Sequence, residues 1–191
     1  MRKSLAFLAL AASLAGCGYN SAIAADEKVK AAWANVENVY QRRADLIPNL
    51  VNTVKGSAAH EEKVLTQVTA ARAQATQVKI SADELSDPEK MRQFEAAQQQ
   101  LSSSLGRLLA VSENYPDLKA NASFRDLQAQ LEGTENRIAV ERRRYNEAVQ
   151  EYNQIVRQFP TSIGAKFAGL KPREPFHATT ANADKAPEVK F

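Results

Sequence analysis

Residues 26–55 read DEKVKAAWANVENVYQRRADLIPNLVNTVK and decide the fold class of this chain. Their apolar side chains recur at steps of three and four residues, which places them on one face of a helix. These positions are Val29, Trp33, Val36, Tyr40, Ile47, Leu50 or Val51, and Val54. Glycine is scarce, and the body of the chain is rich in the helix formers alanine, glutamine, glutamate and arginine. We therefore expect an all-α protein.

Three further apolar stripes follow the first. They run from Val64 to Val78, from Met91 to Tyr115 and from Phe124 to Phe159. Gly56-Ser57 ends the first helix, and Ser86-Asp87-Pro88-Glu89 predicts a helix start with a capping residue, an early proline and an early acid. Pro116 and Pro160 stop the third and fourth stripes. Four amphipathic helices joined by short breaks predict an elongated antiparallel up-down four-helix bundle over residues 26–170.

The C-terminal part of the chain changes composition after Pro160. Ile163, Phe167 and Leu170 predict one short helical turn that docks on the bundle. Residues 171–191 are rich in proline, alanine and polar side chains, and we expect them to form a flexible, extended tail.

Cys17 is the single cysteine of the chain and closes a short apolar run, Leu5–Ala15, that follows two basic residues. The pattern is typical of a bacterial lipobox, which predicts removal of residues 1–16 and lipidation of Cys17, with residues 17–25 as a linker. Two or more acyl chains hold a protein on a membrane almost permanently. We expect a lipoprotein of the bacterial envelope, with the bundle on the exported side and the end of the fourth helix near the membrane. Two alternatives remain open: cleavage after Ala24, which releases a soluble chain, and an uncleaved N-terminal anchor.

Charge and cysteine content exclude several classes of protein. Of 25 basic residues, Arg2 and Lys3 belong to the predicted leader, which leaves 23 against 22 acidic residues. A charge of +1 gives no footprint for nucleic acid. One cysteine excludes an intramolecular disulfide.

No catalytic or metal-binding pattern is present in the sequence. His60-Glu61-Glu62 opens like a zinc-protease motif, but Val64 stands where the second histidine is needed. The other histidine, His177, falls in the predicted tail. A nucleophile elbow, a P-loop and a dinucleotide fingerprint are also absent. We expect a protein without enzymatic activity, metal or cofactor.

Pro48 interrupts a stripe that continues on both sides of it, so a kink or a helix restart is expected there. Our interpretation is structural: Asp45 and Asn49 satisfy the broken backbone groups, while Arg42 and Arg43 pair with acids on adjacent helices. The alternative is a recognition notch. The basic run 142–144 is interpreted as a solvated face paired with Glu141, Glu147 and Glu151.

Two blocks of sequence resemble one known family. The first contains Cys17 to Asn20, Trp33, Tyr40 to Val51, Glu61 and Ala71-Arg72-Ala73; the second contains Glu135 to Ile138, Arg143, Tyr145-Asn146, Val149, Tyr152-Asn153 and Phe159-Pro160. Together they resemble the signature of the LemA family of bacterial membrane-associated proteins. The resemblance implies an antiparallel helical bundle, N-terminal membrane attachment and no established enzymatic activity. It adds Arg143, Tyr145, Asn146, Tyr152 and Asn153 to the candidate structural or interaction residues.

These observations favour an envelope-anchored scaffold or adaptor that binds another membrane-associated protein. The alternative is a ligand-sensing or lipid-handling bundle, which needs an apolar cavity near Trp33, Tyr40 and Tyr145. The sequence leaves the partner and the oligomeric state open.

Overall fold

The computed structural model describes the backbone of residues 2–57 and 61–177, and the side chains of residues 19–56 and 61–177. Within these residues the chain forms six α-helices and one 3₁₀ helix, and the all-α prediction is confirmed. The elements are α1 (Arg2–Ser57), α2 (Glu62–Gln77), η1 (Ala82–Ser86), α3 (Pro88–Ser112), α4 (Pro116–Ala120), α5 (Ala122–Arg157) and α6 (Thr161–Phe167).

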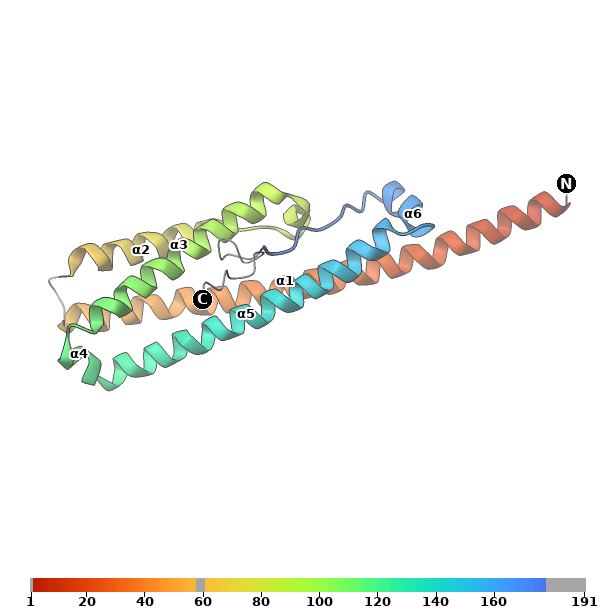
Figure 1. Cartoon of the computed structure of the whole chain (residues 1–191). Coiled ribbons are helices and arrows are strands. Elements are labelled where there is room, and N and C mark those ends of the chain that lie inside the picture. Colours follow the sequence, from red (N-terminus) through yellow and green to blue (C-terminus); the bar gives the residue numbers. More distant parts are fainter. Residues whose placement is uncertain (1, 58–60, 178–191) are drawn as a thin grey trace, which may run out of the picture.

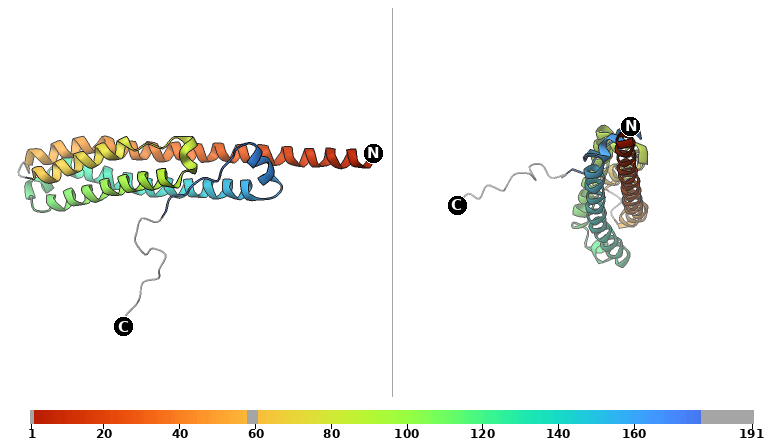
Figure 2. Two further views of the ribbon diagram at one scale, coloured as in Figure 1. Left: turned by 90° about the horizontal axis from the view of Figure 1, so that it is seen from above. Right: turned by 90° about the vertical axis from the view of Figure 1, so that its right-hand side faces the viewer.

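A long antiparallel pair, α1 and α5, forms the spine of the molecule (Figure 1). Two ion pairs between the helices define their alignment: Lys28 pairs with Glu151, and Arg43 pairs with Glu135. At about 1.5 Å per residue, the 36 residues of α5 span about 54 Å. The shorter helices α2 and α3 pack on each other and cover one half of this spine, while α6 packs on the other end (Figures 1 and 2). The result is an elongated molecule.

Local sequence determines where two of the helices begin. Asp87 caps α3, since its Oδ1 accepts hydrogen bonds from the backbone N of Glu89 (2.9 Å) and Lys90 (3.3 Å), with Pro88 in the first turn. The predicted helix start is therefore confirmed. Asn121 caps α5 in the same way, because its Oδ1 accepts from Phe124 N at 3.2 Å.

Helix α1 runs through Pro48 and does not restart there. Proline has no N–H to offer the carbonyl four residues earlier, which belongs to Ala44. Arg72 of α2 fills this role: its Nε donates to Ala44 O at 2.7 Å. The interpretation that Asp45 and Asn49 satisfy the freed group is therefore wrong. Asp45 is exposed and its carboxylate accepts a hydrogen bond from Gln41. The Ala44 carbonyl, which has no partner within α1, therefore binds α2 through Arg72.

The buried apolar side chains form two clusters. The aromatic cluster contains Val29, Trp33, Tyr40, Leu85, Met91, Phe94, Tyr145, Val149, Tyr152 and Phe176 among others. The aliphatic cluster contains Ile47, Leu50, Val54, Leu65, Val68, Leu101, Leu105, Leu108, Leu118, Phe124 and Leu131 among others. A polar layer lies between them, with buried Arg43 and Gln98 at its centre.

The chain turns back after α6 and runs along the bundle. Gly169 has φ +70°, Leu170 N donates to Ala165 O (2.9 Å) and Gly169 N donates to Lys166 O (3.2 Å), which is a Schellman ending. We call residues 170–177, LKPREPFH, the C-terminal strap. The sequence predicts a flexible tail from residue 171, whereas the structure places residues 171–177 extended against the bundle. The rest of the predicted tail, residues 178–191, lies outside the described residues.

Candidate functional site

Two repeated dipeptides on α5, Tyr145-Asn146 and Tyr152-Asn153, hold the C-terminal strap. Asn153 pairs with both backbone groups of Arg173: its Nδ2 donates to Arg173 O (2.9 Å), and Arg173 N donates to its Oδ1 (2.8 Å). Asn146 repeats this arrangement with Phe176, at 3.0 and 2.8 Å. A carboxamide carries the same donor and acceptor as a peptide group, so each asparagine pairs with the strap backbone as a residue of a neighbouring strand would.

The two tyrosines add one hydrogen bond each. The Tyr152 hydroxyl donates to Lys171 O and the Tyr145 hydroxyl donates to Glu174 O, both at 2.9 Å. Both rings are fully buried. Burial raises the pKa of each hydroxyl above its usual range, so both remain protonated donors at physiological pH.

The spacing on the helix matches the spacing on the strap. Seven residues of α5 advance two turns, about 10.5 Å. Three residues of an extended chain advance about 9–10 Å. The strap has prolines at positions 172 and 175, and the residues bound by asparagine are the ones that directly follow them. Because proline has no N–H, these following residues offer the donors that the asparagines need.

Arg173 anchors the strap in the interior. Its Nη2 and Nε donate to Asp26 Oδ1 at 2.8 and 3.1 Å, and both side chains are buried. Its Nη1 donates to Ala82 O at 2.9 Å and to Ser86 Oγ at 3.3 Å. Lys30 adds a second contact to Asp26 at 3.0 Å. One buried guanidinium thus joins the strap to α1 and η1, while the backbone of the same residue joins it to α5.

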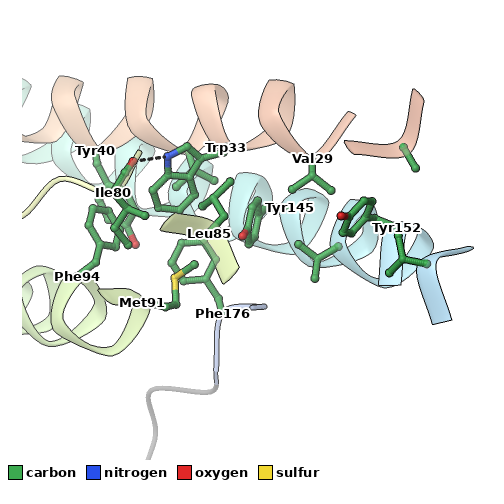
Figure 3. Packing of buried hydrophobic residues seen from close by; sticks show 14 of the residues in the cluster. Val29, Trp33, Tyr40, Ile80, Leu85, Met91, Phe94, Tyr145, Tyr152 and Phe176 are labelled. Carbon is green, nitrogen blue, oxygen red and sulfur yellow. Dashed lines mark hydrogen bonds between the residues drawn. The ribbon is translucent and has the colours of Figure 1, made fainter. Parts of the chain in front are cut away.

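Phe176 completes the aromatic cluster (Figure 3). Its ring centroid lies 5.3 Å from that of Tyr145 and 5.9 Å from that of Trp33. Trp33 also contacts Phe94 at 5.3 Å and donates its Nε1 hydrogen to Ile80 O at 3.2 Å. The rings of Phe94 and Phe176 fill the space beside Trp33 and Tyr145. A hollow of about 310 Å³ beside Tyr40 is lined by Glu37, Ala44, Phe94 and Gln98 among others.

Arg43 organises the polar layer between the two clusters. Its side chain is 1% exposed, and its Nη1 donates to Ser102 Oγ (2.8 Å) and Glu135 Oε1 (2.7 Å). Its Nη2 donates to Gln98 Oε1 at 2.5 Å, and Gln98 Nε2 donates to Ala75 O at 3.2 Å. Four helices therefore meet through one arginine, which pairs with an acid of an adjacent helix as the structural interpretation expected.

A groove runs between α3 and α5 above this layer. One hollow of about 290 Å³ is lined by Arg43, Glu95, Gln98, Ser102 and Arg142 among others. The next, of about 500 Å³, is lined by Ser102, Leu105, Gly106 and Leu109 of α3 and by Leu131, Glu132, Glu135 and Asn136 of α5. A third of about 410 Å³ lies where Arg142, Arg143 and Asn146 meet the end of the strap. We call the first two hollows, which share Ser102 and Glu135, the α3–α5 groove.

The other candidate residues do not join one site. Arg42, Asp45 and Asn49 are exposed on α1, away from the strap contacts. Arg143 is exposed and its Nε lies 3.9 Å from Glu147, in keeping with a solvated face. Its neighbour Arg142 differs, because Nη2 donates to His177 O (3.0 Å) and to Glu95 (3.2 Å) and its guanidinium lies 4.5 Å from the Phe176 ring. The backbone of Cys17 lies in α1, and its side chain falls outside the described ones.

Sequence reasoning named both Tyr-Asn pairs but gave them no common role. It gave no role to Asp26 or Arg173, and it named Arg72 only as part of the first LemA-like block. The available signal was the coincidence of two spacings, a Tyr-Asn pair repeated after seven residues and a Pro-x-x-Pro pair at 172 and 175. Either spacing alone is uninformative.

A sequence model of the LemA family matches residues 32–191. The chain belongs to the LemA family. The matched range contains both Tyr-Asn pairs, the strap, Arg43, Pro48 and Arg72, whereas Asp26 lies before it.

Two relatives of this LemA-family chain are named magnetosome proteins. The chain is 27% identical to magnetosome protein MamQ of Magnetospirillum gryphiswaldense over 179 residues, which covers 85% of this chain and 66% of the relative. It is 26% identical to magnetosome protein MamQ 2 of Paramagnetospirillum magneticum, with the same coverage. The chain thus spans about two thirds (66%) of the length of these relatives.

The described residues of this LemA-family chain hold no group of three or more His, Cys, Asp or Glu side chains arranged to bind a metal. Within the same part of the chain, no helix combines the length and the apolar composition needed to cross a bilayer.

Proposed function

We propose that this LemA-family chain is a membrane-tethered adaptor of the bacterial envelope, without catalytic activity, that binds another membrane-associated protein along the α3–α5 groove. The groove is the observation that carries the proposal. Helix α3 packs mainly on α2 and helix α5 on α1, while hollows of about 290 and 500 Å³ separate α3 from α5. An open groove along two helices, with mixed polar and apolar walls, suits a segment of a protein partner.

The chemistry of the larger hollow indicates the kind of segment it binds. Leu105, Leu109 and Leu131 supply apolar wall, while Glu132 and Asn136 stand at the polar edge. An amphipathic helix lays its apolar face into such a groove and leaves polar groups at the rim. A partner helix seated here would add one further helix to the bundle.

The tether in this proposal is the lipidated Cys17. Its support is the lipobox pattern and the continuous helix α1, which carries the position of Cys17 directly into the bundle. The magnetosome relatives support an association with membranes, which we extend to this chain. Mass spectrometry of the mature N-terminus tests the tether: an acylated peptide beginning at Cys17 is expected, and an unmodified peptide beginning at Ala25 would contradict it.

The groove is tested with a pair of glycine substitutions. A Cβ at Gly106 or at Gly133 meets nothing within 4 Å, so a large side chain fits at either position without disturbing the core. Gly106 lines the groove, whereas Gly133 is exposed on α5 outside it. We expect a photo-crosslinking residue at 106 to capture one reproducible envelope protein in intact membranes, and Gly106→Trp to abolish its co-purification.

The same residue placed at 133 should capture little, and Gly133→Trp should leave co-purification unchanged. Equal capture at both positions, or equal loss with both tryptophans, would sink the proposal. The ligand-sensing alternative has less support, because rings fill the interior near Trp33 and Tyr145.

A further inference from the structure

Exposed apolar side chains gather at one end of the molecule. Among the described side chains, the large hydrophobic ones that are exposed are Tyr19 (43%), Ile23 (36%), Phe159 (80%), Ile163 (52%) and Phe167 (90%). Scattered exposed apolar residues are ordinary, but a concentration of large ones marks a binding surface.

The alignment of α1 and α5 shows that these residues share one level of the bundle. Lys28 contacts Glu151 across the antiparallel pair, so residues 19 and 23 of α1 lie level with about residues 160 and 156 of the other chain segment. Helix α6 packs on α1 and α5 at this end, with Ala165 turned into the bundle. Figure 1 shows α6 beside α1 at the end from which the N-terminal part of α1 projects. We call Tyr19, Ile23, Phe159, Ile163 and Phe167 the end patch.

The charge on the α6 side of the end patch has one sign. From residue 152 to residue 172 the sequence contains no acidic side chain. The same stretch contains Arg157, Lys166 and Lys171, and all three are exposed. Aromatic side chains next to basic ones are the composition of helices that lie in the headgroup region of a bilayer, where cations meet anionic lipids.

We propose that the end patch is a membrane-contact surface, with α6 lying in the headgroup region of an anionic bilayer. Phe159 and Phe167 enter the acyl boundary, and Arg157, Lys166 and Lys171 meet lipid phosphates. The occupant is a lipid surface because the patch lies at the level of Cys17, the position of the proposed tether. The inference rests on the proposed membrane attachment and states which surface faces the lipid.

Contact by α6 changes what a lipid anchor achieves. A tether at one point holds the chain on the membrane but leaves the bundle free to tilt. A second contact through α6 orients the long axis, and carries the α3–α5 groove to a defined distance from the lipid. The charged residues make this contact sensitive to salt and to lipid charge.

The test uses the full chain in vesicles whose acyl chains carry bromine, a quencher of indole fluorescence. Phe167→Trp places an indole in the end patch, and Gly133→Trp places one on exposed α5 away from it; the buried Trp33 gives the same background in both. With vesicles of phosphatidylglycerol and phosphatidylcholine, we expect quenching at 167 at least about threefold stronger than at 133, because the apolar face of an interfacial helix enters the bilayer by several ångströms. In the Phe167→Trp background, Lys166→Glu with Lys171→Glu should reduce this quenching, as should phosphatidylcholine alone.

The outcome separates this inference from the tether. An acylated chain that floats with the vesicles but is not quenched at 167 overturns the end patch and leaves the tether intact. If the mature chain isolated from membranes carries no acyl groups but is still quenched at 167, the end patch is supported and the tether is contradicted. Equal quenching at 167 and 133, or a patch covered by a second copy of the chain in sedimentation without vesicles, also overturns the inference. Unchanged melting temperatures exclude misfolding as the cause.

Discussion

The aromatic and aliphatic clusters solve the same packing problem by different means. In the aliphatic cluster, leucines and valines of α1, α2, α3 and α5 meet across helix faces, which needs little beyond the right periodicity. In the aromatic cluster, α2 has ended and an extended strap takes its place. An extended segment has unpaired backbone groups, so this half requires directional partners from Asn146 and Asn153 and from the tyrosine before each of them. One half of the bundle tolerates approximate packing, and the other depends on specific pairs.

Removing the strap should have the largest effect, and it should destabilise the aromatic cluster far more than the aliphatic cluster. A chain ending at residue 170 loses the Phe176 ring and leaves Asp26 buried without its arginine. We expect local stability around residues 22–40 and 145–156 to fall by more than about 3 kcal/mol, with smaller changes near residues 101–131. Hydrogen exchange reports both halves, and a red shift of the single tryptophan, Trp33, reports the first. A chain ending at residue 177 is the control, and uniform loss across both halves would contradict the expectation.

Arg173→Ala isolates the buried ion pair. Leaving Asp26 buried and unpaired costs about 3–5 kcal/mol, and Lys30, which also contacts Asp26, should hold the value near the lower end. Urea unfolding measures it. Adding Asp26→Ala should recover part of the loss, because the uncompensated charge is then gone. Additive costs for the two substitutions would show that the pair is not coupled.

Asn146→Ala should weaken the strap without emptying the core. The N–H and carbonyl of Phe176 both lose their partner, which costs about 2–3 kcal/mol. Asn146→Asp keeps the acceptor and should cost less. Gln150→Ala, on an exposed position of α5, is the control and should be neutral within about 0.5 kcal/mol. Equal unfolding free energies for Asn146→Ala and Gln150→Ala would show that the Asn146 contacts do not stabilise the strap.

The aliphatic half has one directional contact of its own, from Arg72 to the Ala44 carbonyl. Arg72→Ala should cost about 1–2 kcal/mol in unfolding free energy. In a Pro48→Ala background the restored N–H bonds the same carbonyl within α1, so the cost of Arg72→Ala should fall by about half or more. A double-mutant cycle in urea measures the coupling. An unchanged cost would show that Arg72 acts by some other contact.

The smallest expected effect is a loss of stability at alkaline pH, and it comes from Tyr145 in the aromatic cluster. The pKa of Tyr145 is raised by burial, so the folded state favours the protonated hydroxyl that donates to Glu174. This stabilisation is complete below the ordinary tyrosine pKa of about 10 and is lost as pH rises from there through the folded-state pKa. Tyr145→Phe should cost about 1 kcal/mol at neutral pH and flatten the alkaline fall in melting temperature. A parallel alkaline fall in both proteins would exclude Tyr145 as its source.

The sequence predicted the parts of this structure that local rules control. The apolar stripes gave the helices, and Asp87-Pro88-Glu89 gave the start of α3, because caps act within one turn. The strap escaped prediction because its prolines are ordinary breakers until they lie beside asparagines 20 and 30 residues away. The partner of the Ala44 carbonyl escaped for the same reason, since Arg72 lies 28 residues further along the chain. The lipidation of Cys17 remains a prediction.

Each Tyr-Asn pair of α5, with the strap residue that its asparagine binds, forms one rung of a ladder. The rungs repeat at slightly different distances on the helix and on the strap. Two helical turns advance about 10.5 Å while three extended residues advance about 9–10 Å, so each added rung falls behind by roughly 1 Å. Two rungs absorb this difference within normal hydrogen-bond lengths, as the 2.8–3.0 Å contacts show. A third would be displaced by roughly 2 Å, beyond the reach of a carboxamide. The sequence agrees, because Ile138-Ala139 stands seven residues before the first pair, and Phe159-Pro160 stands seven residues after the second, beyond the end of α5. Among the described residues the strap carries two such rungs, the number that this mismatch accommodates.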